Sequence, residues 1–323
     1  MSAEKDTVLV LSAPDPTAKA VMAELEHHPV NAVALDIGDF PARLALAACT
    51  AEDGQWVGRI VGDGVEVILD RVRGVFYRRP SQFCLPEGLS AGDRALAEYE
   101  ARLGFGGVLA SLDCWWLCHP HTVARAEYKP LQLRELRRAG LATPRTLITN
   151  SHAEALAWAA TIEAAVVCKQ LSPVALEEDG QVRIAYTTPV DVAALDPESV
   201  ACTAHCLQEH VIGKLFEARV TMVGHTAYGV AIHAQSAAAV LDWRRDYSNV
   251  RYERFDPPAE VLAGMRAYLA AMGLRYGCFD LVATENGFLV YECNPAGQYL
   301  WLEHATGLPI SAAIAAYLAR GQG

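Results

Sequence analysis

The sequence lacks any apolar run of the roughly 20 residues that cross a membrane, and its N-terminus lacks the basic start and long apolar stretch of a signal peptide. Basic residues are also scarce: 27 Lys and Arg stand against 38 Asp and Glu, for a net charge of −11. Nucleic acids and anionic membranes are bound by clustered positive charge, so we expect neither as a partner. These absences indicate a cytoplasmic globular protein.

Two common ligand motifs are missing as well. The clusters at Cys114–His121 and Cys202–His210 lack the paired short spacings of a structural zinc site, and we interpret them as core packing. The glycines at 104, 106 and 107 do not form the G-x-x-x-x-G-K-[ST] phosphate loop. The nine cysteines, an odd number, suit free buried thiols in a reducing compartment.

What the sequence does contain is enough apolar residues, 52% of 323, for a sizeable core. Alternating strand and helix patterns predict an α/β (α+β) protein with units at 1–120, 121–207 and 208–323. In the first unit, the strand Val72–Tyr77 runs into Arg78 and Arg79. Arginines at the carboxyl end of such a strand can meet a ligand's anionic group, but they can equally pair with surface acids.

The stretch from Cys278 to Gln298 predicts two strands joined by a tight turn. Alternation places Glu292 and Asn294 on one face of the second strand. A two-residue loop, Asn286-Gly287, would turn Asp280 to the other face. A three-residue loop, Glu285-Asn286-Gly287 with a left-handed glycine, would set Asp280 opposite Glu292. In that second register two carboxylates and an amide oxygen converge, a ligand set that suits Mg²⁺.

Isolated charges lie on the other apolar strands. Lys169 is the one charge in Ala165–Leu171, and a buried ammonium needs an anionic partner, either a phosphate or a nearby acid. Glu217 and Arg219 are two residues apart and so share a face of their strand. A nucleoside triphosphate needs both cations for its phosphates and oxygen ligands for its Mg²⁺. The candidate cations are Lys129, Lys169, Arg219 and Arg244.

In combination these residues resemble the ATP-grasp ligases over 121–323. The matching segments are Lys129, Lys169, Gln208-Glu209-His210-Val211, Glu217-x-Arg219, Asp242-Trp243-Arg244 and Asp280 with Glu292-x-Asn294. Within that superfamily the chain is most similar to the graspetide maturases, the microviridin-type macrocyclases of ribosomal peptides. That likeness rests on the segments at 77–81, 126–130, 242–247 and 294–303.

The resemblance implies an ATP-grasp fold, in which two α+β subdomains clasp ATP behind a small pre-ATP-grasp domain. It also implies roles for individual residues. Lys129 and Lys169 would contact phosphates, Gln208 would bind ATP, and the backbone of Glu209, His210 and Val211 would hold adenine. Glu217 would hold the ribose, Asp280, Glu292 and Asn294 would hold Mg²⁺, and Arg219 and Arg244 would stabilise developing negative charge.

The implied reaction activates Asp or Glu side chains of a precursor peptide as acyl phosphates and closes ω-ester or ω-amide rings. The peptide's leader would dock away from the site, at the hairpin with Glu177, Glu178 and Asp179, although a solvated turn explains these acids equally well. Arg78 and Arg79 are further candidates for binding the peptide. The alternatives are a ligase that adds free amino acids and a non-catalytic ATP-binding regulator. The resemblance also suggests a homodimer.

Overall fold

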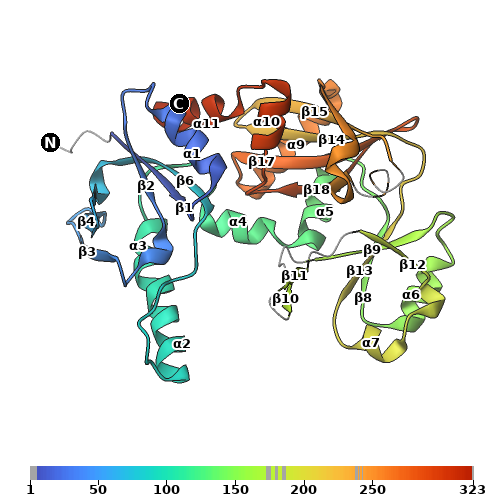
Figure 1. The fold of residues 1–323 in the computed structure, drawn as a ribbon, viewed down its shortest axis with the longest axis horizontal. Coiled ribbons are helices and arrows are strands. Elements are labelled where there is room, and N and C mark those ends of the chain that lie inside the picture. The colour runs from blue at the N-terminus through green and yellow to red at the C-terminus, as the bar shows by residue number, and fades with distance from the viewer. Residues whose placement is uncertain are drawn as a thin grey trace.

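The structure is a computed structural model in which the N-terminal region lies beside the C-terminal region, and the middle of the chain lies below the C-terminal region at the lower right of Figure 1. The helices in the part of the chain that it describes are all too short or too polar to span a bilayer. The side chains at 176–178, 181–183, 244 and 247 are not described. The described residues are 6–171, 176–178, 181–183, 187–236, 239, 241 and 243–321.

Four parallel strands form the first sheet, in the order β2–β1–β6–β7. β1 is buried along its whole length, as expected for a parallel strand that is covered on both faces. Its first connection is α1, whose N-terminus is capped by the Asp15 side chain. The elements are β1 (Thr7–Ser12), α1 (Pro16–Leu25), β2 (Asn31–Leu35), β6 (Val72–Arg79) and β7 (Trp115–Trp116).

A three-stranded antiparallel meander and two short helices flank this sheet. Asp63 and Gly64 form the turn between β4 and β5. The helix α2 projects away from the rest of the molecule and buries none of its residues (Figure 1). The elements are β3 (Leu44–Thr50), β4 (Trp56–Gly62), β5 (Val65–Ile68), α2 (Ala91–Glu100) and α3 (Gly106–Ala110).

The second sheet has the order β12–β9–β13–β8. It follows α4 and α5, and α5 begins at Lys129-Pro130, where the proline suits the first turn. Ser151 caps α6 through the amide of Glu154. The elements are α4 (Pro120–Ala126), α5 (Lys129–Arg138), β8 (Thr146–Thr149), α6 (His152–Ala159), β9 (Val166–Lys169), β12 (Thr188–Val190), α7 (Pro197–Ala201) and β13 (His205–Glu209). The strands β10 (Leu176–Glu178) and β11 (Gln181–Arg183) pair with each other.

The third sheet is antiparallel, with the order β16–β15–β14–β17–β18. α9 ends at Gly273, which has a positive φ of 71° that favours glycine. The elements are β14 (Lys214–Val223), β15 (Thr226–Ala234), β16 (Val250–Arg254), α9 (Ala259–Met272), β17 (Tyr276–Thr284), β18 (Gly287–Asn294), α10 (Leu300–Thr306) and α11 (Ile310–Arg320).

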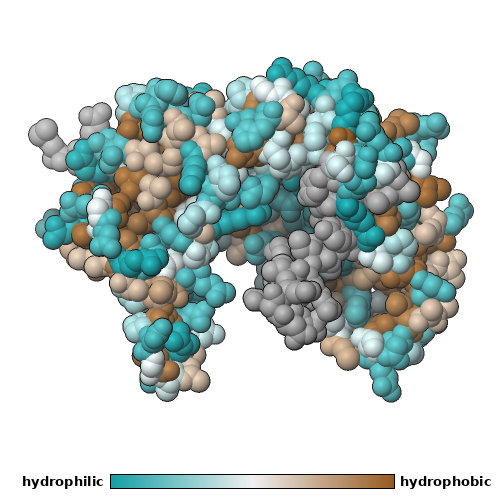
Figure 2. All heavy atoms as spheres, in the orientation of Figure 1, coloured by the Kyte–Doolittle hydropathy of each residue, from teal (hydrophilic) through white to brown (hydrophobic). Residues whose placement is uncertain are grey.

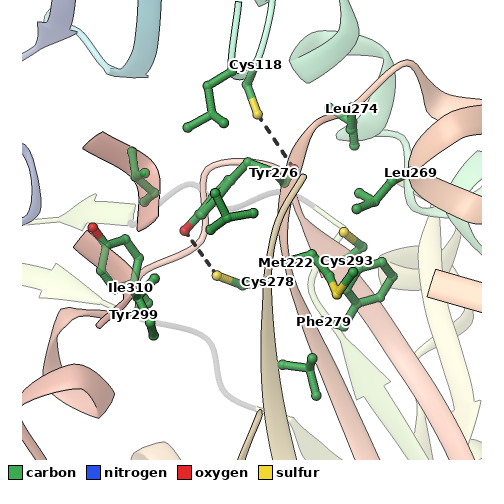
Figure 3. Close-up of a cluster of buried hydrophobic side chains, with 14 of the residues drawn as sticks. Cys118, Met222, Leu269, Leu274, Tyr276, Cys278, Phe279, Cys293, Tyr299 and Ile310 are labelled. Carbon is green, nitrogen blue, oxygen red and sulfur yellow. Dashed lines mark hydrogen bonds between the residues drawn. The ribbon is translucent and has the colours of Figure 1, made fainter. Parts of the chain in front are cut away.

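One hydrophobic core joins the first and third sheets. It contains Val8 and Val10 of β1 together with Val220 of β14 and Phe279 of β17. Figure 3 shows the part of this core that lies around Tyr276, where β17, β18 and the chain near α4 meet. The opposite face of β1 packs into a second core with the meander. The second sheet has its own small core, built on residues such as Val166 and Leu207.

The last helix, α11, returns to the first sheet and packs against α1 and β6. Arg73 of β6 donates a hydrogen bond of 2.8 Å to the carbonyl of Ala319, and Ile314 and Leu318 belong to the shared core. The first unit is therefore completed by residues from the far end of the chain.

All nine cysteines are free. Four of them are buried, including Cys118, Cys278 and Cys293 in the core of Figure 3. The expectation of buried thiols is wrong for Cys49, Cys84 and Cys202, which are exposed.

Candidate functional site

The hairpin of β17 and β18 turns at Glu285-Asn286, with Thr284 opposite Gly287. Both predicted loops are therefore wrong in position. The register nevertheless shifts between Leu281 and Asp280, where a β-bulge leaves Tyr291 as the extra residue. Asp280 consequently lies opposite Glu292, which confirms the predicted register by a different route.

Three oxygen-bearing side chains meet at this point. The amide nitrogen of Asn294 donates hydrogen bonds to Asp280 (3.0 Å) and to Glu292 (3.3 Å). On its other side Asp280 accepts two hydrogen bonds from Arg219, at 2.8 and 2.7 Å. Burial opposes the charge on Arg219, but Asp280 more than compensates and raises the pKa of the guanidinium above its ordinary value.

This ligand set fits Mg²⁺ in its chemistry. No cluster of three or more His, Cys, Asp or Glu side chains that could hold a metal occurs among the described residues. Mg²⁺, however, typically takes one or two carboxylates and completes its shell with water and substrate phosphates. The Asn294 amide already bridges both carboxylates, and a half-turn of that amide would present its oxygen at the same point.

Glu292 is ion-paired with Lys129, the first residue of α5. Burial alone would raise the pKa of Glu292. The nearby ammonium groups of Lys129 and Lys169, with hydrogen bonds from Lys129 and Asn294, lower that pKa to about 2. Glu292 is therefore a carboxylate over the whole physiological pH range and presents its charge to cations.

A pH dependence of stability follows from this shift. Because folding lowers the pKa of Glu292 from 4.5 to about 2, ionised Glu292 stabilises the fold above pH 4.5. That contribution is lost as the pH falls from 4.5 towards 2. Wild type should thus have a higher free energy of unfolding than Glu292→Gln, as measured by denaturant titration. The difference between the two proteins should shrink as the pH falls from 4.5 towards 2. A difference that stays constant would contradict the shift.

Lys169 extends from the second sheet towards Glu292, and its charge acts on that carboxylate. Its ammonium donates a hydrogen bond of 3.3 Å to the Gln208 side chain and lies 4.5 Å from the centre of the Tyr291 ring. Gln208 is buried and in turn donates to the hydroxyl of Thr146 at 2.9 Å. The lysine is therefore held between β13 and the bulged residue of β18.

The segment from Gln208 to Val211 leaves the second sheet beside this lysine. The amides of Glu209 and His210 donate to the carbonyls of Arg145 and Ala165. Among the described residues, none accepts a hydrogen bond from the amide of Val211. Burial and nearby Lys214 lower the pKa of His210, so its ring is neutral near pH 7.

A single cleft contains most of the predicted residues, and the second and third sheets both contribute to it. Figure 2 shows an open notch below α4 that is bordered above by mainly hydrophilic side chains; the cleft itself is defined by the residues that line it. The predicted residues that line the cleft are Lys169, Gln208, Glu209, His210, Val211, Glu217, Arg219, Asp280 and Glu292.

The cleft also contains side chains to which the sequence assigned no role. Lys214 forms an ion pair with Glu217, and the Trp243 ring lies 5.7 Å from the guanidinium of Arg219. Lys214 carried a usable signal, because it starts an apolar strand three residues before Glu217. Tyr291 carried none, since regular alternation would turn it away from Glu292.

Lys129 and Asn294 contact the cleft through Glu292. Arg79 is exposed, whereas Arg78 is buried and contacts only other parts of this protein, so it has no surface with which to meet a peptide. The side chains of Arg244, Glu177 and Glu178, and the whole of Asp179, lie outside the described residues.

Comparison with known proteins gives matches along nearly the whole chain. Residues 7–124 match the family described as the MvdD pre-ATP grasp domain. A RiPP-associated ATP-grasp ligase from Chryseobacterium gregarium, in complex with ADP and leader and core peptides, has a TM-score of 0.89 at 24% identity, covering 98% of each chain. Macrocyclase MdnC from Microcystis aeruginosa MRC, bound to precursor peptide MdnA, has a TM-score of 0.83 at 29% identity, covering 98% of this chain and 100% of MdnC.

A third structure is less similar in sequence. The ATP-grasp ligase PsnB, complexed with minimal precursor, Mg and ADP, has a TM-score of 0.76 at 20% identity, covering 98% of each chain. No curated protein matches the sequence.

Proposed function

We propose that this chain is an ATP-grasp ligase with a pre-ATP-grasp domain, which has the ATP-grasp fold that the sequence resemblance implied. It is an ATP-dependent macrocyclase of a ribosomally made precursor peptide. It activates Asp or Glu side chains of that peptide and joins them to Thr or Ser hydroxyls, or to Lys amines. The peptide substrate is supported by similar structures that contain precursor peptides.

The observation that carries the proposal is the juxtaposition of opposite charges in one cleft. Lys169 enters from the second sheet, and Asp280 and Glu292 enter from the third. Cations and oxygen ligands that face each other in this way match the two needs of a triphosphate with its divalent ion. Complexes of similar folds with ADP and Mg support the same choice of ligands.

The nucleotide would lie along the cleft from Val211 to Asp280. The Val211 amide is available to the adenine ring, and Glu217 would accept hydrogen bonds from the ribose hydroxyls. Lys169 and Lys129 would donate to the phosphates. Lys129 forms an ion pair with Glu292. When a magnesium nucleotide binds, the Lys129 ammonium would move from the Glu292 carboxylate to a phosphate.

Asp280, Glu292 and Asn294 would hold Mg²⁺, which when bound would offset negative charge on the phosphoryl group. Arg219 keeps Asp280 in place and also lies in the cleft, where its charge would stabilise developing oxyanions. Arg244 remains a proposed partner in that role. Lys169 and Arg219 together would orient the γ-phosphate towards the peptide carboxylate.

The chemistry then takes two steps. A side-chain carboxylate of the peptide takes the γ-phosphoryl group from ATP, giving an acyl phosphate and ADP. A hydroxyl or amine of the same peptide attacks the carbonyl carbon, phosphate leaves, and the nucleophile loses its proton. Closing the second sheet over the third would exclude water, which would otherwise hydrolyse the acyl phosphate.

We further propose that the chain is divided into units at 1–120, 121–207 and 208–323. The strand β13 crosses the last boundary. Arg79 and the acids at 177–179 stay candidate contacts for the peptide, and a homodimer stays a suggestion of the resemblance. Nine free cysteines suit a reducing compartment such as the cytoplasm.

The direct test is mass spectrometry of a candidate precursor after incubation with the protein and Mg·ATP. Each ring should remove the mass of one water from the peptide and release one ADP. Release of ADP with free amino acids alone would instead indicate a ligase of small molecules. Binding of ATP without turnover on any peptide or amino acid would indicate a regulator, and both outcomes would overturn the macrocyclase assignment.

A further inference from the structure

The segment at 295–298 follows Asn294 directly and is hydrogen-bonded to its surroundings on several sides. The Gly297 amide donates to the Asn294 carbonyl at 3.1 Å. A Cβ at Gly297 would lie 2.4 Å from the Cβ of Cys278, so only glycine fits there. Tyr276 donates to the Gly297 carbonyl at 2.7 Å from the core in Figure 3.

Five further hydrogen bonds join this segment to β6 and to the start of α1, which are more than 200 residues away in sequence. Arg78 is completely buried and donates to the carbonyls of Ala296 and Gly297. Arg79 donates to the Ala296 carbonyl at 2.9 Å. The side chain of Gln298 accepts from Thr17 at 2.8 Å and donates to Asp15 at 3.2 Å, which joins it to the start of α1.

The segment in turn contacts the proposed metal site. The Gln298 carbonyl accepts a hydrogen bond of 3.0 Å from Arg219, the side chain that grips Asp280 with its other nitrogens. Asn294 precedes the segment and is fixed to it by the turn at Gly297. A displacement of 295–298 would therefore reach both Asn294 and Arg219.

Packing alone does not explain why a buried arginine stands at position 78. Two of its buried nitrogens, Nε and Nη2, have no hydrogen-bond partner among the described residues, and its nearest carboxylate, that of Asp15, lies 3.7 Å away. A buried charge with incomplete pairing is often less stabilising than an apolar side chain of similar size. The contribution that remains is its hydrogen bonds to the two carbonyls, which fix the position of the backbone there.

We propose that Arg78 is a positioning residue for the metal and phosphate site, acting with Asp15 and Thr17. It fixes the 295–298 segment from the first sheet, and through that segment it sets the positions of Asn294 and Arg219. The pre-ATP-grasp domain thus takes part in building the catalytic centre. This inference rests on the proposed function, because it presupposes a metal at Asp280, Glu292 and Asn294.

The test compares Mn²⁺ binding, followed by electron paramagnetic resonance in the presence of ADP, in wild type and Arg78→Met. The variant should bind Mn²⁺ about 10- to 100-fold more weakly, the usual loss when an outer-shell partner is removed. Affinity for ADP without metal, measured by calorimetry, should change little. Arg78→Lys, which can still donate to one carbonyl, should recover part of the loss.

Arg73→Met is the matched control, since Arg73 lies on the same strand and also donates to a distant carbonyl, that of Ala319 in α11. It should bind Mn²⁺ as wild type does, whatever its melting temperature. Equal losses in the two variants, or no loss in Arg78→Met, would overturn the inference and leave the proposed function standing. Failure of wild type to bind Mn²⁺ with ADP would instead remove the proposed function, and this inference with it.

If Arg78→Met does not fold, Thr17→Val tests the same link with a nearly isosteric change. Loss of the Thr17 hydrogen bond to Gln298 should weaken Mn²⁺ binding about fivefold, the effect of one ordinary hydrogen bond. Wild-type affinity in a folded Thr17→Val protein would count against the proposal.

Discussion

Replacing Glu292 by Gln should abolish ring formation, slowing it by at least about 10³-fold, while the protein still folds. Gln keeps the shape of the side chain but removes the charge that faces Lys129 and the proposed divalent ion. Asp280 is already committed to Arg219, so little negative charge would remain to hold a metal. The measurement is the rate of ring formation at saturating Mg·ATP, followed by mass spectrometry, with circular dichroism to confirm the fold.

The matched control for this variant is Glu253→Gln on β16. Glu253 is ion-paired as well, with Arg251 and His233, but its side chain is 55% exposed and it does not line the cleft. Its replacement should leave the rate unchanged. Turnover by Glu292→Gln at the wild-type rate would show that Glu292 does not hold a catalytic metal, whatever the fold.

Replacing Lys169 by Met should raise the KM for ATP by about 10- to 100-fold, because one charge-assisted hydrogen bond to phosphate is lost. The aliphatic stem keeps its place beside Tyr291, and Gln208 loses only one partner. Steady-state assays at fixed precursor and varied ATP measure the change. The effect should be larger on KM than on kcat if the lysine binds the nucleotide equally in ground and transition states.

The chain offers a second lysine for comparison. Lys19 lies on α1, away from the cleft, and Lys19→Met should leave the ATP dependence unchanged. An unchanged KM for ATP in Lys169→Met would return that lysine to a structural role, as a cation held by Gln208 and Tyr291 within the fold.

The elements themselves were largely predictable, because apolar periodicity and capping residues are local. Pro130 in the first turn of α5 and Ser151 at the cap of α6 are local signals of this kind. The meeting of Asp280 with Glu292 was foreseen as one of two registers. The bulge that produces it was not, since it depends on how β17 and β18 pair rather than on their own composition.

Long-range contacts set the limit of the sequence analysis. Arg78 at the end of a strand suggested a ligand's anion, yet its carbonyl acceptors come from residues 296 and 297, which no local pattern connects to β6. The ion pair of Lys129 with Glu292 spans 163 residues and likewise left no trace in spacing. The sequence shows which side chains are charged, but which of them are in contact depends on the tertiary structure.

The return of α11 to the first sheet bears on how the polypeptide is made. The hydrogen bond from Arg73 to Ala319 joins residues 246 positions apart, so during synthesis β1 and β6 emerge from the ribosome long before the helix that covers them. Until then α1 covers that face of the early sheet without α11, so part of its apolar surface stays exposed, a condition that favours association with chaperones. The N-terminal region therefore cannot finish folding ahead of the rest, and the two ends of the molecule mature together.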